Sequence, residues 1–302
     1  MKGLSFKPLA EGELPQTPRD AATILFLRDQ EGNDGTTVLE VFSVERSQGS
    51  GFLAGAVVFP GGKVDPHDHH PDWLEHLSLS ESASIAAGWI ELAEHSSMQR
   101  ALGIAACREA LEEAGVLLSA SGAPIDTTGA SQTAFGIHIL ESLRARGDKL
   151  DLSLLRPFGR WLTPKEEARR FDTRFFLATV PEGQVLTADE HETTKPSWST
   201  PSALLRRFEK GEIQLAPPTH RCLEILEGFT STRDALCAEY NCSLICPEVV
   251  VDGDTFALTL PGDREHTKKI PVVPGRSRYV LRGEQFLPED APYWRKTLPP
   301  LK

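Results

Sequence analysis

The sequence lacks three features that would place it in common protein classes. No apolar run approaches the ~18 consecutive residues that a membrane-spanning helix needs. Basic residues are few, with 32 Lys and Arg against 43 Asp and Glu, and the net charge of −11 argues against nucleic acids and anionic membranes as partners. The five cysteines are an odd number in a chain of 302 residues, which favours reduced thiols in a cytoplasmic protein over a disulfide framework.

Other familiar motifs are missing as well. Cys237, Cys242 and Cys246 lie close in sequence, but no Cys-x-x-Cys pair accompanies them, so a solvated or packed role is favoured over zinc. The sequence contains neither a Walker phosphate-binding motif nor a Gly-x-Ser-x-Gly nucleophile elbow. Residues 1–10 have no apolar run of signal-peptide length, and the chain does not end in Ser-Lys-Leu, so we expect neither export nor peroxisomal import.

The composition is that of a folded protein, with 40% hydrophobic and 25% charged residues. Apolar alternation and turn residues predict a mixed α/β domain followed by an α/β C-terminal extension. Strands are expected at 21–27, 37–45, 56–59 and 173–180 and around Trp198, and hairpins at 248–260 and 276–286. Pro60-Gly61-Gly62 indicates a turn, and helices are expected at 80–95, 98–114, 201–210, 219–228 and 232–240.

The segment Arg108 to Val116 contains the most informative residues. Glu109, Glu112 and Glu113 have i, i+3, i+4 spacing, which places three carboxylates on one helical face. Such a cluster is commonly a solvated acidic face, but it also suits a hard divalent cation such as Mg²⁺, which prefers carboxylate oxygen. Gly61-Gly62 precede the helix, and Gly115 suits the left-handed position just after it.

This pattern, Gly-Gly followed by Arg-Glu-aliphatic-x-Glu-Glu-x-Gly-aliphatic, resembles the Nudix box. The resemblance implies an α/β/α sandwich with a mixed β-sheet. It also implies hydrolysis of a diphosphate with Mg²⁺ or Mn²⁺ held by Glu109, Glu112 and Glu113. Arg108 would orient a carboxylate, and Gly61 and Gly62 would contribute to substrate binding.

The box departs from the compact pattern by a long insert. Gly62 to Val116 spans 55 positions where the compact pattern needs 23, so 32 residues are added, at about residues 66–98. Counting back from Arg108, the early glutamate position of the box is occupied by Arg100, and Asp65 is a candidate replacement. A helical insert at this point resembles the coenzyme A diphosphatase branch of the family.

Segments outside the box resemble the same branch. They are Trp161-x-Thr163-Pro164, 170–176, and Leu215-x-Pro217-Pro218-Thr219. Arg46-Ser47 match a coenzyme A signature, and Arg46 is a candidate phosphate contact, although Gly51 replaces the second arginine of that signature. Glu192, with Glu190 as the alternative, is a candidate metal ligand or general base, against the simpler interpretation of an acidic solvated loop.

The resemblance divides the chain into a Nudix domain at 18–218 and a helical and β-hairpin extension at 219–302. It predicts a diphosphatase acting on coenzyme A or acyl-coenzyme A, with Glu112, Glu113, Glu192 and Arg108 as catalytic residues. NADH, ADP-sugars or dinucleoside polyphosphates are alternative substrates, and a non-catalytic nucleotide sensor is a third possibility. The expected partner is a small nucleotide diphosphate, and a homodimer is a further possibility.

Two other groups of residues favour a structural role over a functional one. His67, His69, His70 and His76 lack helical spacing and favour a solvated loop over a metal site. Cys107 precedes Arg108 on the predicted helix and favours core packing over a nucleophilic role.

Overall fold

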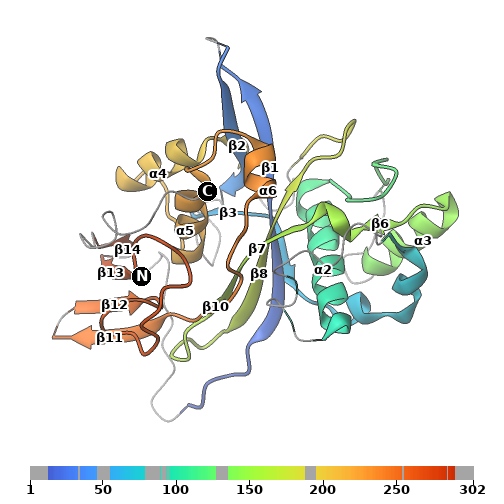
Figure 1. Ribbon diagram of the computed structural model, residues 1–302. Helices are drawn as coiled ribbons and strands as arrows, with labels where there is room; N and C mark the ends of the chain where they lie inside the picture. The colour runs from blue at the N-terminus through green and yellow to red at the C-terminus, as the bar shows by residue number, and fades with distance from the viewer. Residues whose placement is uncertain are drawn as a thin grey trace.

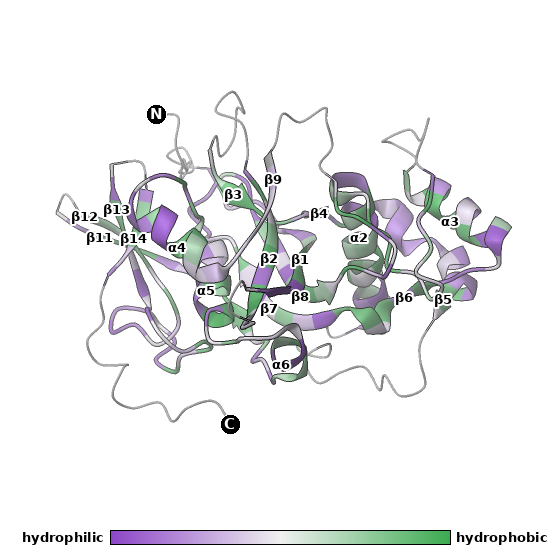
Figure 2. Cartoon of the chain, turned by 90° about the horizontal axis from the view of Figure 1, so that it is seen from above, coloured by the Kyte–Doolittle hydropathy of each residue, from purple (hydrophilic) through white to green (hydrophobic). Residues whose placement is uncertain are grey.

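The computed structural model shows a central β-sheet between two layers (Figure 1). The layer on one face contains α2 and α3, and the layer on the other contains α4, α5 and a second, smaller sheet, as the view from above also shows (Figure 2). The structure describes residues 13–32, 35–45, 55–78, 89, 93, 95–126, 135–187, 195–253, 255–283 and 285–289.

The central sheet is mixed. Its strands follow the order β10-β7-β8-β1-β2-β3, with β4 paired to β1 and β9 paired to β2. β1 runs parallel to β8, and β10 runs parallel to β7, whereas the other pairs are antiparallel. The strands are β1 Arg19–Glu31, β2 Thr37–Glu45, β3 Val57–Val58, β4 Gly61–Lys63, β7 Arg156–Leu162, β8 Phe171–Thr179, β9 Lys195–Ser199 and β10 Leu244–Ile245.

Strand β1 separates the two hydrophobic cores of the molecule. Ala22, Ile24 and Phe26 point into the core on the α2 side, whereas Leu25 and Leu27 point into the opposite core. Successive side chains of a strand alternate between the two faces of a sheet, so a strand covered on both sides must be apolar at nearly every position. This explains why residues 21–27 are apolar at every position except Thr23.

On the first face, α2 (Ser96–Ala114) packs against the sheet through small residues. Ala101, Ala105, Ala106, Ala110 and Ala114 are fully buried, and their size lets the helix approach the strands closely. The other elements on this side are η1 Pro66–His69, η2 Pro71–His76, β5 Leu77–Ser78, α3 Phe135–Arg146, β6 Leu150–Asp151 and η4 Leu152–Leu154.

The described part of the insert contributes to this core. Trp73 and Trp89 are 2% and 6% exposed, and the ring of Trp89 lies 5.1 Å from that of Phe176 on β8. His67 and His76 are half-buried in η1 and η2. The stretch is therefore two short helices rather than the predicted loop, because Trp73 and the capping side chain of Asp65 order it, whereas His69 and His70 are exposed as expected.

The second face is covered by the C-terminal part of the chain. Leu204, Leu223 and Tyr279 share one core with Leu25 and Leu27 of β1. The predicted boundary at 218/219 falls within α5, which begins at Pro217. The elements here are α4 Pro201–Glu209, α5 Pro217–Leu226, α6 Thr232–Cys237, and the antiparallel strands β11 Glu248–Asp252, β12 Thr255–Thr259, β13 Arg278–Arg282 and β14 Gln285–Pro288.

Most elements expected from the sequence within the described residues are confirmed. Gly61-Gly62 form the short strand β4 rather than a turn, because they pair with Ala22 and Thr23 of β1. Helix α3, strand β7 and the short elements η1, η2, β5, β6, η4 and β10 were not predicted. The helix expected at 232–240 ends at Cys237. The helix expected at 80–95 lies almost entirely outside the described residues.

None of the helices in the described part of the chain combines the length and the apolar character that a bilayer-spanning segment needs.

Candidate active site

The acidic face predicted from the sequence lies on the C-terminal half of α2. Glu109 is buried, whereas Glu112 and Glu113 are half-buried. The helix ends at Gly115, whose φ of 70° is left-handed, and the Gly115 N–H donates to carbonyls of the preceding turn. This ending confirms the C-terminal glycine expected from the sequence, because only glycine adopts that conformation without strain.

Gly61 and Gly62 lie directly against this acidic face. The Gly61 N–H donates to Glu113 Oε2 at 2.9 Å. A Cβ on Gly62 would stand 2.4 Å from Glu109 Oε1, and one on Gly61 would stand 2.5 Å from the carbonyl oxygen of Ala22. Both positions therefore need glycine so that β4 can approach β1 and the two carboxylates together.

The Arg108 guanidinium connects the acidic face of α2 to β4, the strand that contains Gly61 and Gly62. Its Nε and Nη2 donate to the two oxygens of Asp68 at 3.0 and 3.1 Å, and Nη2 also donates to the Lys63 carbonyl at 2.9 Å. Its Nη1 donates to Glu109 at 2.7 Å and to Glu112 at 3.1 Å. One arginine side chain, 8% exposed, thus fixes two of the three predicted metal ligands.

Asp68, rather than Asp65, is the acidic partner of Arg108. Asp65 instead caps η1 by accepting the His67 N–H at 3.2 Å. Counting forward from Gly62 reaches Asp68 after five intervening residues, which is the early acidic position of the compact pattern. Counting back from Arg108 missed it because 39 residues, rather than seven, separate Asp68 from Arg108, so the insert begins after Asp68.

The family assignment rests on a match over more than half of the chain. The family described as the NUDT19 Nudix domain matches residues 18–225, which include Gly61-Gly62 and the whole acidic helix. The chain belongs to the Nudix hydrolases, in the NUDT19 branch. The Nudix relationship inferred from the box is therefore confirmed.

Curated relatives and a solved structure agree with this assignment. A chicken protein named acyl-coenzyme A diphosphatase NUDT19 is 29% identical over 89% of this chain and 85% of its own length. The human protein of the same name is 28% identical over 83% of this chain and 79% of its own. A Nudix hydrolase from Alicyclobacillus acidocaldarius is 28% identical, with a TM-score of 0.59 over 75% of this chain and 97% of its own.

The charges around the Nudix helix do not balance. Burial raises the pKa of Glu112 to about 7, and Glu109 adds to this whereas Arg108 opposes it. Burial also raises the pKa of Glu109. Burial lowers the pKa of Arg108, but its hydrogen bonds and charge pairing with Asp68, Glu109 and Glu112 outweigh this and raise it. Among the described residues, Asp68, Glu109 and Glu112 share the ion pairs of Arg108, and the charge of Lys63 lowers the pKa of Glu109 without outweighing its burial. Further positive charge would therefore stabilise the ionised site.

The Nudix residues fit a divalent cation by donor type. Glu109, Glu112 and Glu113 supply hard carboxylate oxygens, and the absence of a side chain at Gly62 lets the Glu109 carboxylate lie against β4. Within the described residues, no three His, Cys, Asp or Glu side chains already converge as a metal cage. Arg108 and the Gly61 N–H hold the carboxylates instead, so a bound cation would share these carboxylate oxygens with them.

Several predicted functional residues lie outside this geometry. Arg46, Glu190 and Glu192 fall outside the described residues. Cys107 is fully buried, and burial raises the pKa of its thiol, which agrees with core packing rather than a nucleophile. Cys237, Cys242 and Cys246 are free thiols and, among the residues that the structure describes, are part of no metal group.

Proposed function

We propose that this protein is a diphosphatase that hydrolyses the diphosphate linkage of coenzyme A or acyl-coenzyme A. The products would be 3′,5′-ADP and phosphopantetheine or its acyl derivative. The observation that carries the proposal is the buried Arg108 side chain, which joins β4 to Glu109 and Glu112 of the Nudix helix, while the Gly61 N–H of β4 holds Glu113. The relatives named acyl-coenzyme A diphosphatase support the choice of substrate.

Mg²⁺ or Mn²⁺ is proposed as the cofactor, with Glu109, Glu112 and Glu113 as its ligands. A bound divalent cation supplies positive charge against the phosphoryl oxygens and makes water a stronger nucleophile. The net charge of −11 would otherwise oppose a polyanionic substrate. The cation, rather than the surface lysines and arginines, would therefore meet the diphosphate.

The protein's own groups then have separate tasks. The Gly61 N–H and Arg108 hold Glu113 and Glu112 in place before substrate arrives, which reduces the reorganisation needed during the reaction. A carboxylate, from Glu112, Glu113 or Glu192, would accept the proton of the attacking water. Arg46 and the glycines at 61 and 62 are proposed to contact the substrate, with the guanidinium of Arg46 pairing with phosphate oxygens.

A substrate panel tests the proposal. The purified protein is incubated with Mg²⁺ or Mn²⁺ and coenzyme A, acyl-coenzyme A, NADH, ADP-ribose or diadenosine tetraphosphate, and the products are identified by mass. We expect 3′,5′-ADP from the coenzyme A substrates at a kcat/KM well above that for the other compounds. Preferred cleavage of NADH or ADP-ribose would change the substrate, and binding without cleavage of any compound would indicate a sensor.

A further inference from the structure

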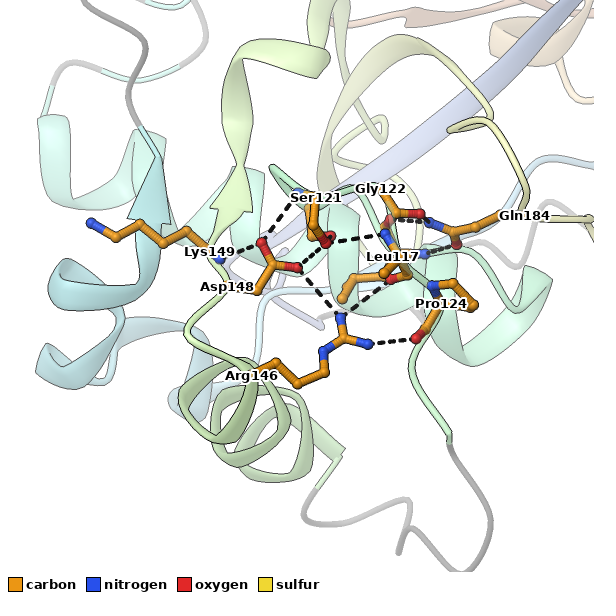
Figure 3. A network of polar contacts seen from close by, with 10 residues as sticks. Leu117, Ser121, Gly122, Pro124, Arg146, Asp148, Lys149 and Gln184 are labelled. Atoms are coloured by element: carbon orange, nitrogen blue, oxygen red, sulfur yellow. Dashed lines mark hydrogen bonds and ion pairs between the residues drawn. The ribbon is translucent and has the colours of Figure 1, made fainter.

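The segment 180–187, which follows β8, lies against the C-terminal end of the Nudix helix. Gln184 is 9% exposed, and its side chain accepts the Leu117 N–H at 2.9 Å and donates to the Leu117 carbonyl at 2.8 Å. The same amide nitrogen donates to the Gly122 carbonyl at 2.8 Å. Figure 3 shows Gln184 beside Leu117 and Gly122, so one side chain satisfies both backbone groups of Leu117.

A second contact holds the helix itself. The Thr187 N–H donates to the carbonyl of Ala114, the last residue of α2, at 3.0 Å. Carbonyls in the last turn of a helix have no partner within the helix and need one from elsewhere. A Cβ on Gly115 would stand 2.6 Å from Thr187 Oγ1, so the segment packs directly on the final glycine of the box.

These contacts hold the end of the helix and the residues directly after it, next to the turn that contains Glu112 and Glu113. Helix ends are among the first regions of a protein to open, and ligand side chains must be held to within about 0.5 Å for tight binding. We propose that Gln184 is a positioning residue, which fixes the last turn of the Nudix helix so that Glu112 and Glu113 are ordered for a divalent cation. This inference rests on the metal-dependent function proposed above.

Asp148 provides a matched control, because it holds the chain that follows the Nudix helix at a different point from Gln184. Asp148, 8% exposed, accepts the N–H groups of Ser121 and Lys149 at 3.2 and 2.8 Å and pairs with Arg146 at 3.4 Å. Figure 3 shows Asp148 and Gln184 on opposite sides of the chain that follows the helix. Asp148 thus anchors this chain at Ser121, and the contacts described for it include no bond to Ala114 or Leu117.

The test compares Gln184→Leu, which has similar size and no polar group, with Asp148→Ala. Mn²⁺ is titrated into chelator-treated protein and the free ion is followed by electron paramagnetic resonance, while thermal unfolding without metal reports stability. We expect Gln184→Leu to raise the Mn²⁺ concentration at half-saturation about 10-fold, the lower end of the effect of residues that support metal ligands. Asp148→Ala is expected to change it less than about 2-fold, even where both variants lower Tm.

Kinetics add a readout that general destabilisation would not change. We expect turnover by Gln184→Leu to recover toward the wild-type rate at saturating Mg²⁺, with KM for the coenzyme A substrate unchanged. Gln184→Glu retains the acceptor for Leu117 but loses both donated bonds, so it is the second variant if the leucine variant fails to fold, with the same expected weakening.

The outcomes separate this inference from the proposed function. Unchanged Mn²⁺ binding in the Gln184 variants, equal weakening in Asp148→Ala, or no Mn²⁺ binding by the wild type would overturn the positioning role. If the wild type hydrolyses no diphosphate but the Gln184 variants still bind Mn²⁺ more weakly, the proposed function fails and the positioning role stands.

Discussion

Glu112 on the Nudix helix and Glu224 on α5 are buried to similar extents but differ in their electrostatic surroundings. Their side chains are 23% and 20% exposed. Burial raises the pKa of Glu112 to about 7. Burial also acts on Glu224, but a hydrogen bond from His220 and the charges of Arg221 and Arg276 outweigh it, and the pKa of Glu224 is lowered.

The difference between the two sites is the local ratio of charges. Glu112 shares one arginine with Asp68 and Glu109, whereas Glu224 pairs with both Arg221 and Arg276. Nearby cations favour the ionised form of a buried carboxylate, whereas neighbouring carboxylates disfavour it. Among the described residues, Glu224 therefore keeps a lowered pKa through its own cationic partners, whereas Glu109 and Glu112 have raised pKa values that a bound cation would lower.

Neutralising a Nudix glutamate gives the largest effect that this comparison predicts. We expect Glu112→Gln or Glu113→Gln to lower kcat by at least ~10³-fold, because each removes a preorganised charge at the reacting centre. The measurement is steady-state turnover of the best coenzyme A substrate at saturating Mg²⁺. Glu224→Gln is the matched control and is expected to retain kcat within about 2-fold. Near-normal turnover by both Nudix variants would refute the site assignment.

Removing the partner of Arg108 tests how the Nudix carboxylates are oriented. We expect Asp68→Asn to lower kcat/KM by roughly 10- to 100-fold, since groups that orient metal ligands typically have effects of this size. Asp65→Asn changes only the cap of η1 and is expected to have an effect below about 3-fold. The reverse order of the two variants in a kcat/KM assay would restore Asp65 as the early acidic residue of the box.

Local patterns in the sequence predicted the Nudix helix well. The spacing of Glu109, Glu112 and Glu113 and the glycine at 115 are features of one helix and its end, and neighbouring residues determine both. The hairpins β11–β12 and β13–β14 were predicted for the same reason, since alternation and a tight turn lie within a dozen residues.

Contacts between distant residues could not be predicted in this way. Asp68 reaches Arg108 across 40 positions, and the insert hides the regular spacing that identifies such a pair in a compact box. The Gln184 contact with Leu117 spans 67 positions, and the His220 contact with Tyr279 spans 59. Each depends on how strands and loops pack, which local propensity does not determine.

The Glu224 cluster is expected to change stability rather than catalysis. Because the folded-state pKa of Glu224 is below its usual value of 4.5, its stabilisation is complete above pH 4.5 and is lost as pH falls through the folded-state value. Glu224→Gln is expected to lower the free energy of unfolding at pH 7 by about 2 kcal/mol, as for a hydrogen bond to a charged group. Urea unfolding should show the difference from wild type shrinking below pH 4.5, and a constant difference would contradict the pairing.

The smallest expected effect is in the same cluster, at the fully buried Tyr279. Its hydroxyl lies 3.0 Å from Nδ1 of His220, and Tyr279→Phe removes this hydrogen bond while keeping the ring in the core. We expect a loss of about 1 kcal/mol in the free energy of unfolding, as for one neutral hydrogen bond, with turnover unchanged. The five tryptophans allow urea unfolding to be followed by fluorescence. A 10-fold fall in turnover with so small a loss of stability would show that the C-terminal layer is coupled to the Nudix site. The assignment of Glu112 to catalysis and of Glu224 to stability alone would then be wrong.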